Sequence, residues 1–111
     1  MKQLILLACL FISQILYPQK HWESIVLADD IWSYMPAASE PTSGWNQPDF
    51  DDSSWLTGPG GFGYADGDDK TITVAVNSIY IRKKFSIDET SLINQLLLDV
   101  DYDDAFVAYL N

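Results

Sequence analysis

Apolar and polar side chains alternate most clearly over residues 96–102. One set consists of Leu98, Val100 and Tyr102, and the other consists of Asp99, Asp101 and Asp103. Successive side chains of a β-strand point to opposite faces, so this segment predicts a strand with one buried and one solvated face. Two-sided strands of this kind are typical of antiparallel sheets.

Residues 78–87 follow the same two-residue period. Ile79, Ile81, Phe85 and Ile87 fall on one side, and Tyr80, Arg82 and Lys84 fall on the other. We expect the aliphatic side to be buried. The basic cluster at residues 82–84 is expected to be a solvated face rather than a docking site.

The remaining strand candidates are short. They are residues 31–34, 71–76 and 105–110. Residues 36–48 are expected to be a proline-containing loop, and residues 58–69 a surface loop that holds five of the six glycines. Helical periodicity is scarce, although residues 92–97 could form one turn. Short strands between Gly, Pro, Asp and Ser clusters predict an all-β fold, an antiparallel β-sandwich or barrel.

Residues 1–19 have the layout of a secretory signal peptide: a lysine near the start, an apolar run at 4–16, then polar residues. The run has 13 residues, whereas a membrane-spanning helix needs about 20. A buried first helix is the alternative. We therefore predict that the protein is secreted or held at the cell surface. Residues 20–111 would be a single mature domain without a transmembrane segment.

The chain carries 16 acidic and 6 basic residues, a formal net charge of −10. A nucleic-acid-binding protein needs a basic patch to neutralise phosphates, so the composition argues against nucleic acid as a partner. Cys9 is the one cysteine and lies inside the predicted signal peptide. We therefore expect neither a disulfide nor a zinc–thiolate site in the mature domain.

Two aromatic residues in the predicted loops, Trp45 and Tyr64, are candidates for ligand binding. An aromatic face stacks on the apolar face of a sugar, and nearby carboxylates accept the protons of its hydroxyl groups. The alternative is that both side chains belong to the core, as bulky residues of a small domain usually do.

Asp66, Asp68 and Asp69 form a candidate Ca²⁺ site, because Ca²⁺ takes six to eight oxygen ligands. The spacing does not fit an EF-hand loop, since position 12 counted from Asp66 is Asn77. A turn with exposed carboxylates is the alternative.

Other acidic residues favour structural roles. Asp103 and Asp104 are adjacent, so on a strand they would point to opposite faces rather than flank one glycosidic bond. We expect them to form a turn between two strands. Asp52 or Ser53 is expected to cap a short helical turn or close an Asx-turn above a core Trp55.

Gly58, Gly60 and Gly63 match the spacing of the dinucleotide-binding fingerprint. That mechanism requires a helix directly after the glycines, whereas an aspartate-rich loop follows here, so a dinucleotide site is not expected. His21, the sole histidine, lies at a terminus that is expected to fray, which argues against a catalytic triad.

Several segments in this order resemble the galactose-binding-like jelly-roll module of secreted bacterial proteins. They are WSY at 32–34, Trp45, DFDDSSW at 49–55, GPGGFGYADGDD at 58–69, YIRKKFSI at 80–87 and LDVDYDDAFVAYLN at 98–111. Modules of this family occur beside hydrolase, metallophosphoesterase or spore-coat-H-type kinase domains, and the sugar-binding domains of family 2 glycosidases are similar. The resemblance covers residues 22–111 and implies a jelly roll, but it is not specific to one ligand.

The sequence departs from the module at two points. Ala105 stands where the module usually has glycine after the paired aspartates. The module also continues after its YLN segment with glycine and further strands, whereas Asn111 is the last residue here. We therefore expect the sequence to be the N-terminal part of a longer module.

Three functions are consistent with these patterns. The first is a non-catalytic module that binds carbohydrate or supports an adjacent domain. The second is a structural N-terminal domain of a secreted enzyme whose catalytic part lies beyond residue 111. The third is an adhesion domain stabilised by Ca²⁺.

Overall fold

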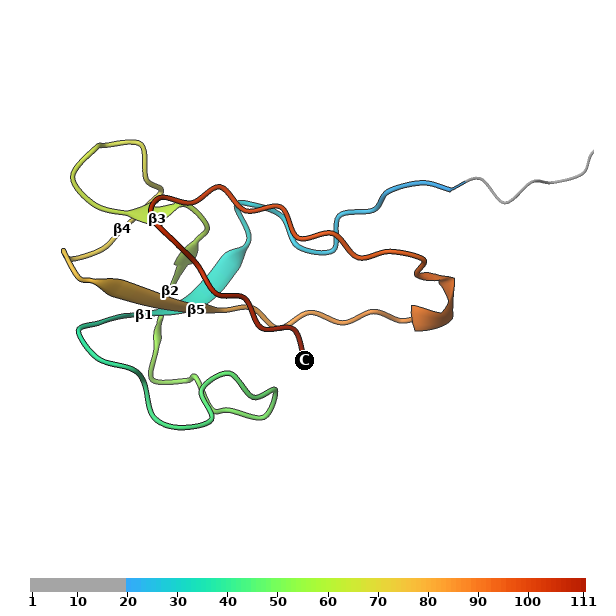
Figure 1. Ribbon diagram of the computed structural model, residues 1–111, viewed down its shortest axis with the longest axis horizontal. Coiled ribbons are helices and arrows are strands. Elements are labelled where there is room, and N and C mark those ends of the chain that lie inside the picture. Colours follow the sequence, from blue (N-terminus) through green and yellow to red (C-terminus); the bar gives the residue numbers. More distant parts are fainter. Residues whose placement is uncertain (1–19) are drawn as a thin grey trace, which may run out of the picture.

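The computed structural model describes residues 20–111 (Figure 1). The predicted signal peptide, residues 1–19, lies outside the described residues. Within the described part, no helix has the length and apolar character that a membrane span requires.

The organising element is a three-stranded antiparallel sheet (Figure 1). Its central strand β1 (Ile31–Ala37) pairs with β2 (Leu56–Pro59) on one side and with β5 (Ser78–Arg82) on the other. β3 (Phe62–Gly63) and β4 (Thr71–Ile72) form a separate parallel pair. The one helical element between residues 20 and 111 is the 3₁₀ turn η1 (Thr90–Leu92). The predicted all-β class with antiparallel pairing is confirmed, while the sandwich or jelly-roll arrangement stays a prediction.

β1 is longer than the predicted strand at residues 31–34 and includes Pro36 and Ala37, for which the sequence predicts a loop. β2 covers β1 only from Ile31 to Tyr34, whereas β5 pairs with it as far as Ala37. Beyond Tyr34 one side of β1 is therefore an edge. Proline is tolerated there because no partner strand requires its missing N–H group.

The two faces of the sheet carry different layers. Met35 and Tyr80 lie opposite each other on neighbouring strands, so their side chains are on the same face of the sheet. We call this the loop face, because Trp45 of the loop at residues 38–55 packs against Tyr80. Tyr34 lies on the opposite face, the β3 face, where its ring lies 5.2 Å from that of Phe62. Figure 1 shows the loop and the β3–β4 pair on opposite sides of the sheet.

The prediction that residues 58–69 form a surface loop is wrong for the first residues of this segment. Gly58 and Gly60 are buried, and Gly58 and Pro59 belong to β2. A methyl group on Gly60 would lie 1.9 Å from the carbonyl oxygen of Ala28, and one on Gly58 would lie 2.6 Å from Oγ1 of Thr71. These glycines allow close approach of neighbouring segments. A strand and not a helix follows them, which removes the geometry of a dinucleotide site.

The strand predictions in the second half of the chain are too long or wrong. β4 ends at Ile72 rather than residue 76, and β5 ends at Arg82 rather than residue 87. Residues 96–102 and 105–110, both predicted strands, are extended but belong to no sheet. In residues 84–111, the backbone–backbone hydrogen bonds are those of the η1 turn. Alternation is present in these segments, but no neighbouring backbone lies in register to pair with them.

The predicted turn at Asp103 and Asp104 is present. Asp104 has a φ of +68°, in the left-handed region that Asp tolerates better than most residues. Its backbone N–H donates to Oδ1 of Asp103 over 3.1 Å. The chain bends here, but the segments on either side are not strands, so the predicted turn between two strands is present only as a bend.

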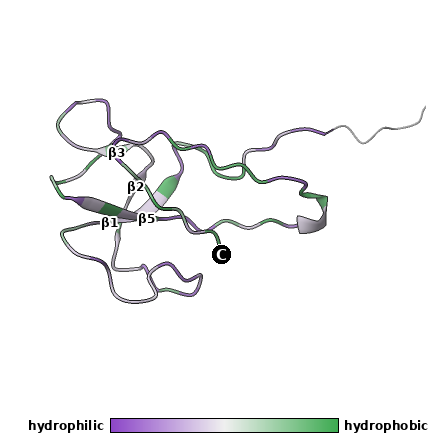
Figure 2. Cartoon of the chain, viewed as in Figure 1, coloured by the Kyte–Doolittle hydropathy of each residue, from purple (hydrophilic) through white to green (hydrophobic). Residues whose placement is uncertain are grey.

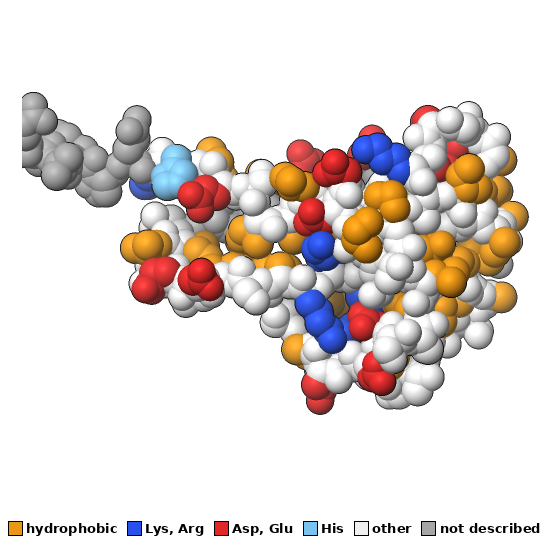
Figure 3. All heavy atoms as spheres, turned by 180° about the vertical axis from the view of Figure 1, so that it is seen from behind, with side chains coloured by type: hydrophobic (Ala, Val, Ile, Leu, Met, Phe, Trp, Pro, Cys, Tyr) orange, Lys and Arg blue, Asp and Glu red, His pale blue; other side chains and the backbone are white. Residues whose placement is uncertain are grey.

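The described part of the chain has no fully buried apolar side chain. Figure 2 shows apolar residues both in the sheet and along the extended segments of residues 84–111, and Figure 3 shows many of them open on one surface. Leu92 and Val107, for example, are 76% and 77% exposed. An aromatic cluster, made by Trp45, Phe50, Trp55 and Tyr80, lies between the loop face and residues 38–55.

Candidate functional site

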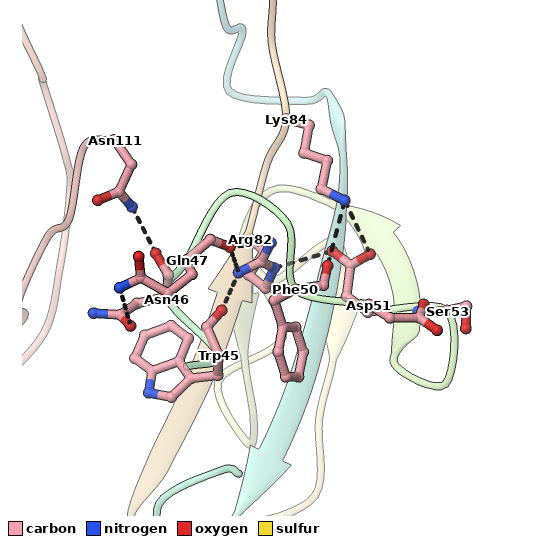
Figure 4. Close-up of polar contacts among 10 residues, drawn as sticks. Trp45, Asn46, Gln47, Phe50, Asp51, Ser53, Arg82, Lys84 and Asn111 are labelled. Atoms are coloured by element: carbon pink, nitrogen blue, oxygen red, sulfur yellow. Dashed lines mark hydrogen bonds and ion pairs between the residues drawn. The ribbon is translucent and has the colours of Figure 1, made fainter. Parts of the chain in front are cut away.

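Arg82 holds the loop at residues 38–55 against the sheet (Figure 4). Its Nε donates to Oδ2 of Asp52 over 3.1 Å. Its two terminal nitrogens donate to the carbonyl oxygen of Gln47 over 3.2 and 3.1 Å, and one of them also reaches the carbonyl oxygen of Trp45. The guanidinium carbon lies 5.1 Å from the ring centre of Phe50. One planar cation therefore fixes four positions of the loop.

The prediction that the basic cluster is a solvated face is wrong for Lys83, which is 22% exposed and lies 3.3 Å from Asp30, and for Arg82, whose side chain is only 9% exposed. Lys84, two residues later, is 62% exposed and conforms to the prediction. The alternation in the sequence predicts the same side for both, although β5 ends at Arg82. Both side chains reach the loop, since Nζ of Lys84 donates to the carbonyl oxygen of Phe50 over 3.4 Å, but only Arg82 is largely removed from solvent.

The turn at residues 49–55 is built differently from the prediction. Asp51, not Asp52 or Ser53, closes the Asx-turn, since its Oδ1 accepts the backbone N–H of Ser53 over 3.0 Å. Asp52 instead pairs with Arg82, and its carbonyl oxygen accepts the N–H of Trp55 over 2.9 Å.

Both aspartates have a lowered pKa. The side-chain and backbone hydrogen bonds from Ser53 lower the pKa of Asp51. Burial is the largest single effect on Asp52 and raises its pKa, but the hydrogen bond from Arg82 and the charge of Lys84 help to outweigh it. The pKa of Asp52 therefore lies below its ordinary value, which keeps the carboxylate charged beside Arg82.

Trp45 is the centre of the aromatic cluster. Its ring is stacked at 27° on Trp55 with centres 6.4 Å apart, and it meets Tyr80 edge-on at 5.0 Å. Tyr109, from the last extended segment, meets it at 89° and 5.7 Å. The hydrogen bond from Nδ2 of Asn111 to the carbonyl oxygen of Asn46, 2.6 Å long, holds that segment beside the loop (Figure 4).

A cavity of about 360 Å³ opens beside this cluster. It is lined by Glu40, Pro41, Ser43, Gly44, Trp45, Asn46 and Tyr109. Its size is within the range of small-molecule sites, about 300–1,000 Å³. The lining surface is mainly polar, and Pro41, Trp45 and Tyr109 contribute its smaller apolar part beside a carboxylate, a hydroxyl and an amide.

Tyr64, the second predicted ligand-binding residue, does not join this cavity. It follows β3, which packs on the opposite face of the sheet from Trp45. Its side chain is 51% exposed. The two predicted aromatic residues therefore cannot contact one small ligand together.

The three residues of the candidate Ca²⁺ site do come together. Asp66, Asp68 and Asp69 each offer a carboxylate oxygen, and these oxygens lie within 4.8 Å of one another. Hydrogen bonding with Asp68 is the main effect that lowers the pKa of Asp66, whereas burial and then the charge of Asp66 raise that of Asp69. The cluster is on an exposed turn, and exposed carboxylates of this kind are also compatible with solvation alone.

His21 lies at the exposed start of the described chain, where its Nε2 is 2.9 Å from Oε1 of Glu23. The two side chains are 70% and 80% exposed, so this is a surface contact between an imidazole and a carboxylate.

The sequence did not identify the contribution of Glu40, Asn46 and Tyr109 to the cavity. Glu40 and Asn46 lie in the same loop as Trp45, so their proximity could have been anticipated. Tyr109 is 64 positions away, and no local pattern indicates that its segment returns to that loop.

Comparison with known proteins identified no family model, curated protein or solved structure that matches this chain.

Proposed function

We propose that this protein is a non-catalytic, exported module that binds carbohydrate in the cavity beside Trp45. The cavity itself is the observation that carries the proposal: two perpendicular aromatic rings adjoin a carboxylate, a hydroxyl and an amide. The sequence resemblance to a galactose-binding-like jelly roll is consistent with this function. The extended segments at residues 84–111 would be strands of such a jelly roll.

The chemistry of the lining suits a sugar. A pyranose ring has an apolar face, which packs on an aromatic ring, and peripheral hydroxyl groups, which need polar partners. Trp45 and Tyr109 supply the rings, while Glu40, Ser43 and Asn46 supply acceptors and donors. Glu40 is the one carboxylate in the lining, whereas glycoside hydrolysis uses two carboxyl groups about 5–9.5 Å apart.

Arg82 prepares the site for binding. Because its guanidinium group fixes the backbone at Trp45 and Gln47, the loop does not have to be ordered when the ligand arrives. Preorganisation of this kind reduces the entropic cost of association.

The main alternative is a structural domain of a secreted enzyme. The contacts of Trp45 with Trp55 and Tyr80 favour it, because they are also what a core tryptophan would make. In that case, replacing residues of the cavity changes stability and nothing else.

A glycan panel screened with the full chain tests the proposal. We expect at least one sugar to bind. We expect Tyr109→Ala to abolish binding while the chain stays folded, because the side chain of Tyr109 is 57% exposed and its ring contacts that of Trp45. Trp45→Ala should also abolish binding, but it additionally disrupts the contacts with Trp55 and Tyr80.

Tyr64→Ala is the matched control, since it removes an exposed tyrosine from the opposite face. The Tyr64→Ala variant should bind the sugar with the same affinity as the unmodified protein. Absence of binding to every glycan would refute the carbohydrate function and leave the structural one.

A further inference from the structure

The cavity beside Trp45 carries negative charge and no compensating positive charge. Glu40 is the acidic residue of the lining, and the lining contains no lysine, arginine or histidine. Arg82, which lies outside the lining, directs its nitrogens at Asp52 and at the carbonyl oxygens of Trp45 and Gln47. Asp52 lies 3.1 Å from Arg82 and 4.0 Å from Lys84, so both cations are directed at this carboxylate.

The aromatic rings of the cavity also favour a cation. Trp45 and Tyr109 meet at 89° with ring centres 5.7 Å apart, so they form a corner at the cavity wall. A positive charge within about 6 Å of a ring centre is attracted by the electrons of the ring face, most strongly for tryptophan. A carboxylate in the same place would be repelled both by the rings and by Glu40.

The charge of the whole chain acts in the same direction. With a formal net charge of −10, the protein attracts cationic ligands and repels anionic ones during encounter. The charge of Glu40, the rings of Trp45 and Tyr109, and the net charge of the chain therefore all favour a positively charged ligand.

We propose that the site selects sugars that carry an ammonium group, namely amino sugars, over neutral sugars and over sugars that carry a carboxylate. This inference rests on the proposed carbohydrate function and specifies its ligand class. Glu40 pairs with the ammonium group, the corner of Trp45 and Tyr109 surrounds it, and Ser43 and Asn46 bind hydroxyl groups.

The test compares three oligosaccharides of equal length with the full chain: a glucosamine oligomer, its fully N-acetylated counterpart and a uronic acid oligomer. N-acetylation removes the positive charge and leaves the sugar ring in place. We expect the glucosamine oligomer to bind about tenfold more tightly than the N-acetylated one at low salt, with the difference falling as salt is added. The uronic acid oligomer should bind most weakly.

Two matched variants separate local from overall charge. Glu40→Gln removes one negative charge inside the cavity, and Glu89→Gln removes one beside η1, outside it. We expect Glu40→Gln to lower glucosamine affinity severalfold and affinity for the N-acetylated oligomer clearly less, because only the former loses a charge pair, and Glu89→Gln to change neither.

Three other outcomes would contradict different parts of the proposal. Equal affinity for the amino and N-acetylated oligomers would overturn the ammonium preference but leave carbohydrate binding intact. Equal effects of the two glutamate variants would overturn the role of Glu40. If no oligomer binds and the glycan panel is also negative, the carbohydrate function fails together with this inference.

Discussion

At the scale of single residues, Arg82 connects the sheet to the loop that carries the candidate site. Its planar group satisfies the carboxylate of Asp52 and the carbonyl oxygens of Trp45 and Gln47 at once. Lysine has the same charge but presents it at one point, so it cannot reproduce this set of bonds. Hydrogen bonds to a charged group contribute about 1.5–3 kcal/mol each.

We expect Arg82→Lys to reduce the free energy of unfolding by about 2 kcal/mol, because part of this network is lost and Asp52 keeps an incomplete partner. Urea denaturation measures the change. Lys84→Ala is the control: that side chain is 62% exposed, so its effect should be within about 0.5 kcal/mol. Equal effects of the two substitutions would contradict the assigned role of Arg82.

The Asp52–Arg82 pair should also make stability depend on acidity. The pKa of Asp52 in the folded chain is below its ordinary value of 3.8. Ionised Asp52 therefore contributes its full share of the folding stability above pH 3.8. This contribution is lost as the pH falls through the lower pKa that Asp52 has in the folded chain. We expect unfolding free energy to decrease below about pH 4, and to decrease less steeply in Asp52→Asn. Identical pH slopes for the two proteins would show that the pair does not contribute.

The sequence predicted which side of the strand Arg82 occupies but not its burial. Alternation over residues 78–87 is a local property and correctly groups Tyr80 with Arg82. The expectation that the aliphatic side is buried is wrong, since Ile81 and Phe85 are 42% and 40% exposed. Whether the side of Arg82 is solvated depends on the path of residues 38–55, which is a long-range property. For the same reason Trp45 could be named as a candidate, while its partner Tyr109 could not.

At the scale of elements, close backbone contacts fix the start of the sheet. Gly60 is buried where the chain leaves β2, and its N–H donates to the carbonyl oxygen of Asp30 over 3.0 Å. A side chain at this position would collide with the backbone of Ala28, which cannot move without moving the entry to β1. The glycine-rich segment therefore serves packing.

We predict that Gly60→Ala reduces the free energy of unfolding by at least about 2 kcal/mol, because backbone atoms must shift to admit the methyl group. Gly67→Ala is the comparison: nothing lies within 4 Å of an added methyl group there, although its φ of +85° costs about 1 kcal/mol. Thermal melts of both variants measure the difference. A smaller loss for Gly60→Ala than for Gly67→Ala would contradict this account.

Element predictions succeeded where pairing partners are close in the structure and failed elsewhere. The candidate at residues 31–34 became β1, because β2 and β5 flank it. The equally regular candidate at residues 96–102 has no paired backbone on either side. A two-residue period therefore predicts the direction of side chains, but it contains no information on hydrogen-bonded neighbours.

At the scale of the whole molecule, apolar exposure is the dominant property. Large apolar side chains on the extended segments remain substantially exposed, including Leu97, Leu98 and Leu110 at 62–66%. The same segments present unpaired backbone groups, which favour pairing between chains. Burial of apolar surface is the main source of folding stability, so little of it is realised within residues 20–111.

We therefore expect residues 20–111 alone to have marginal stability, to bind a hydrophobic fluorescent dye and to self-associate as concentration rises. Sedimentation velocity over a concentration series measures the association. A soluble monomer with a cooperative thermal melt and no dye binding would be inconsistent with the exposed surface described above.

The central claim is that a sugar binds beside Trp45. The most direct measurement is a ¹⁵N-correlated NMR spectrum of the full chain, with and without a saturating sugar, in which the indole N–H resonances of the four tryptophans are followed. We predict a large shift for Trp45, a smaller one for the stacked Trp55, and none for Trp22 or Trp32. A shift confined to Trp22 or Trp32, or no shift at all, would contradict the claim.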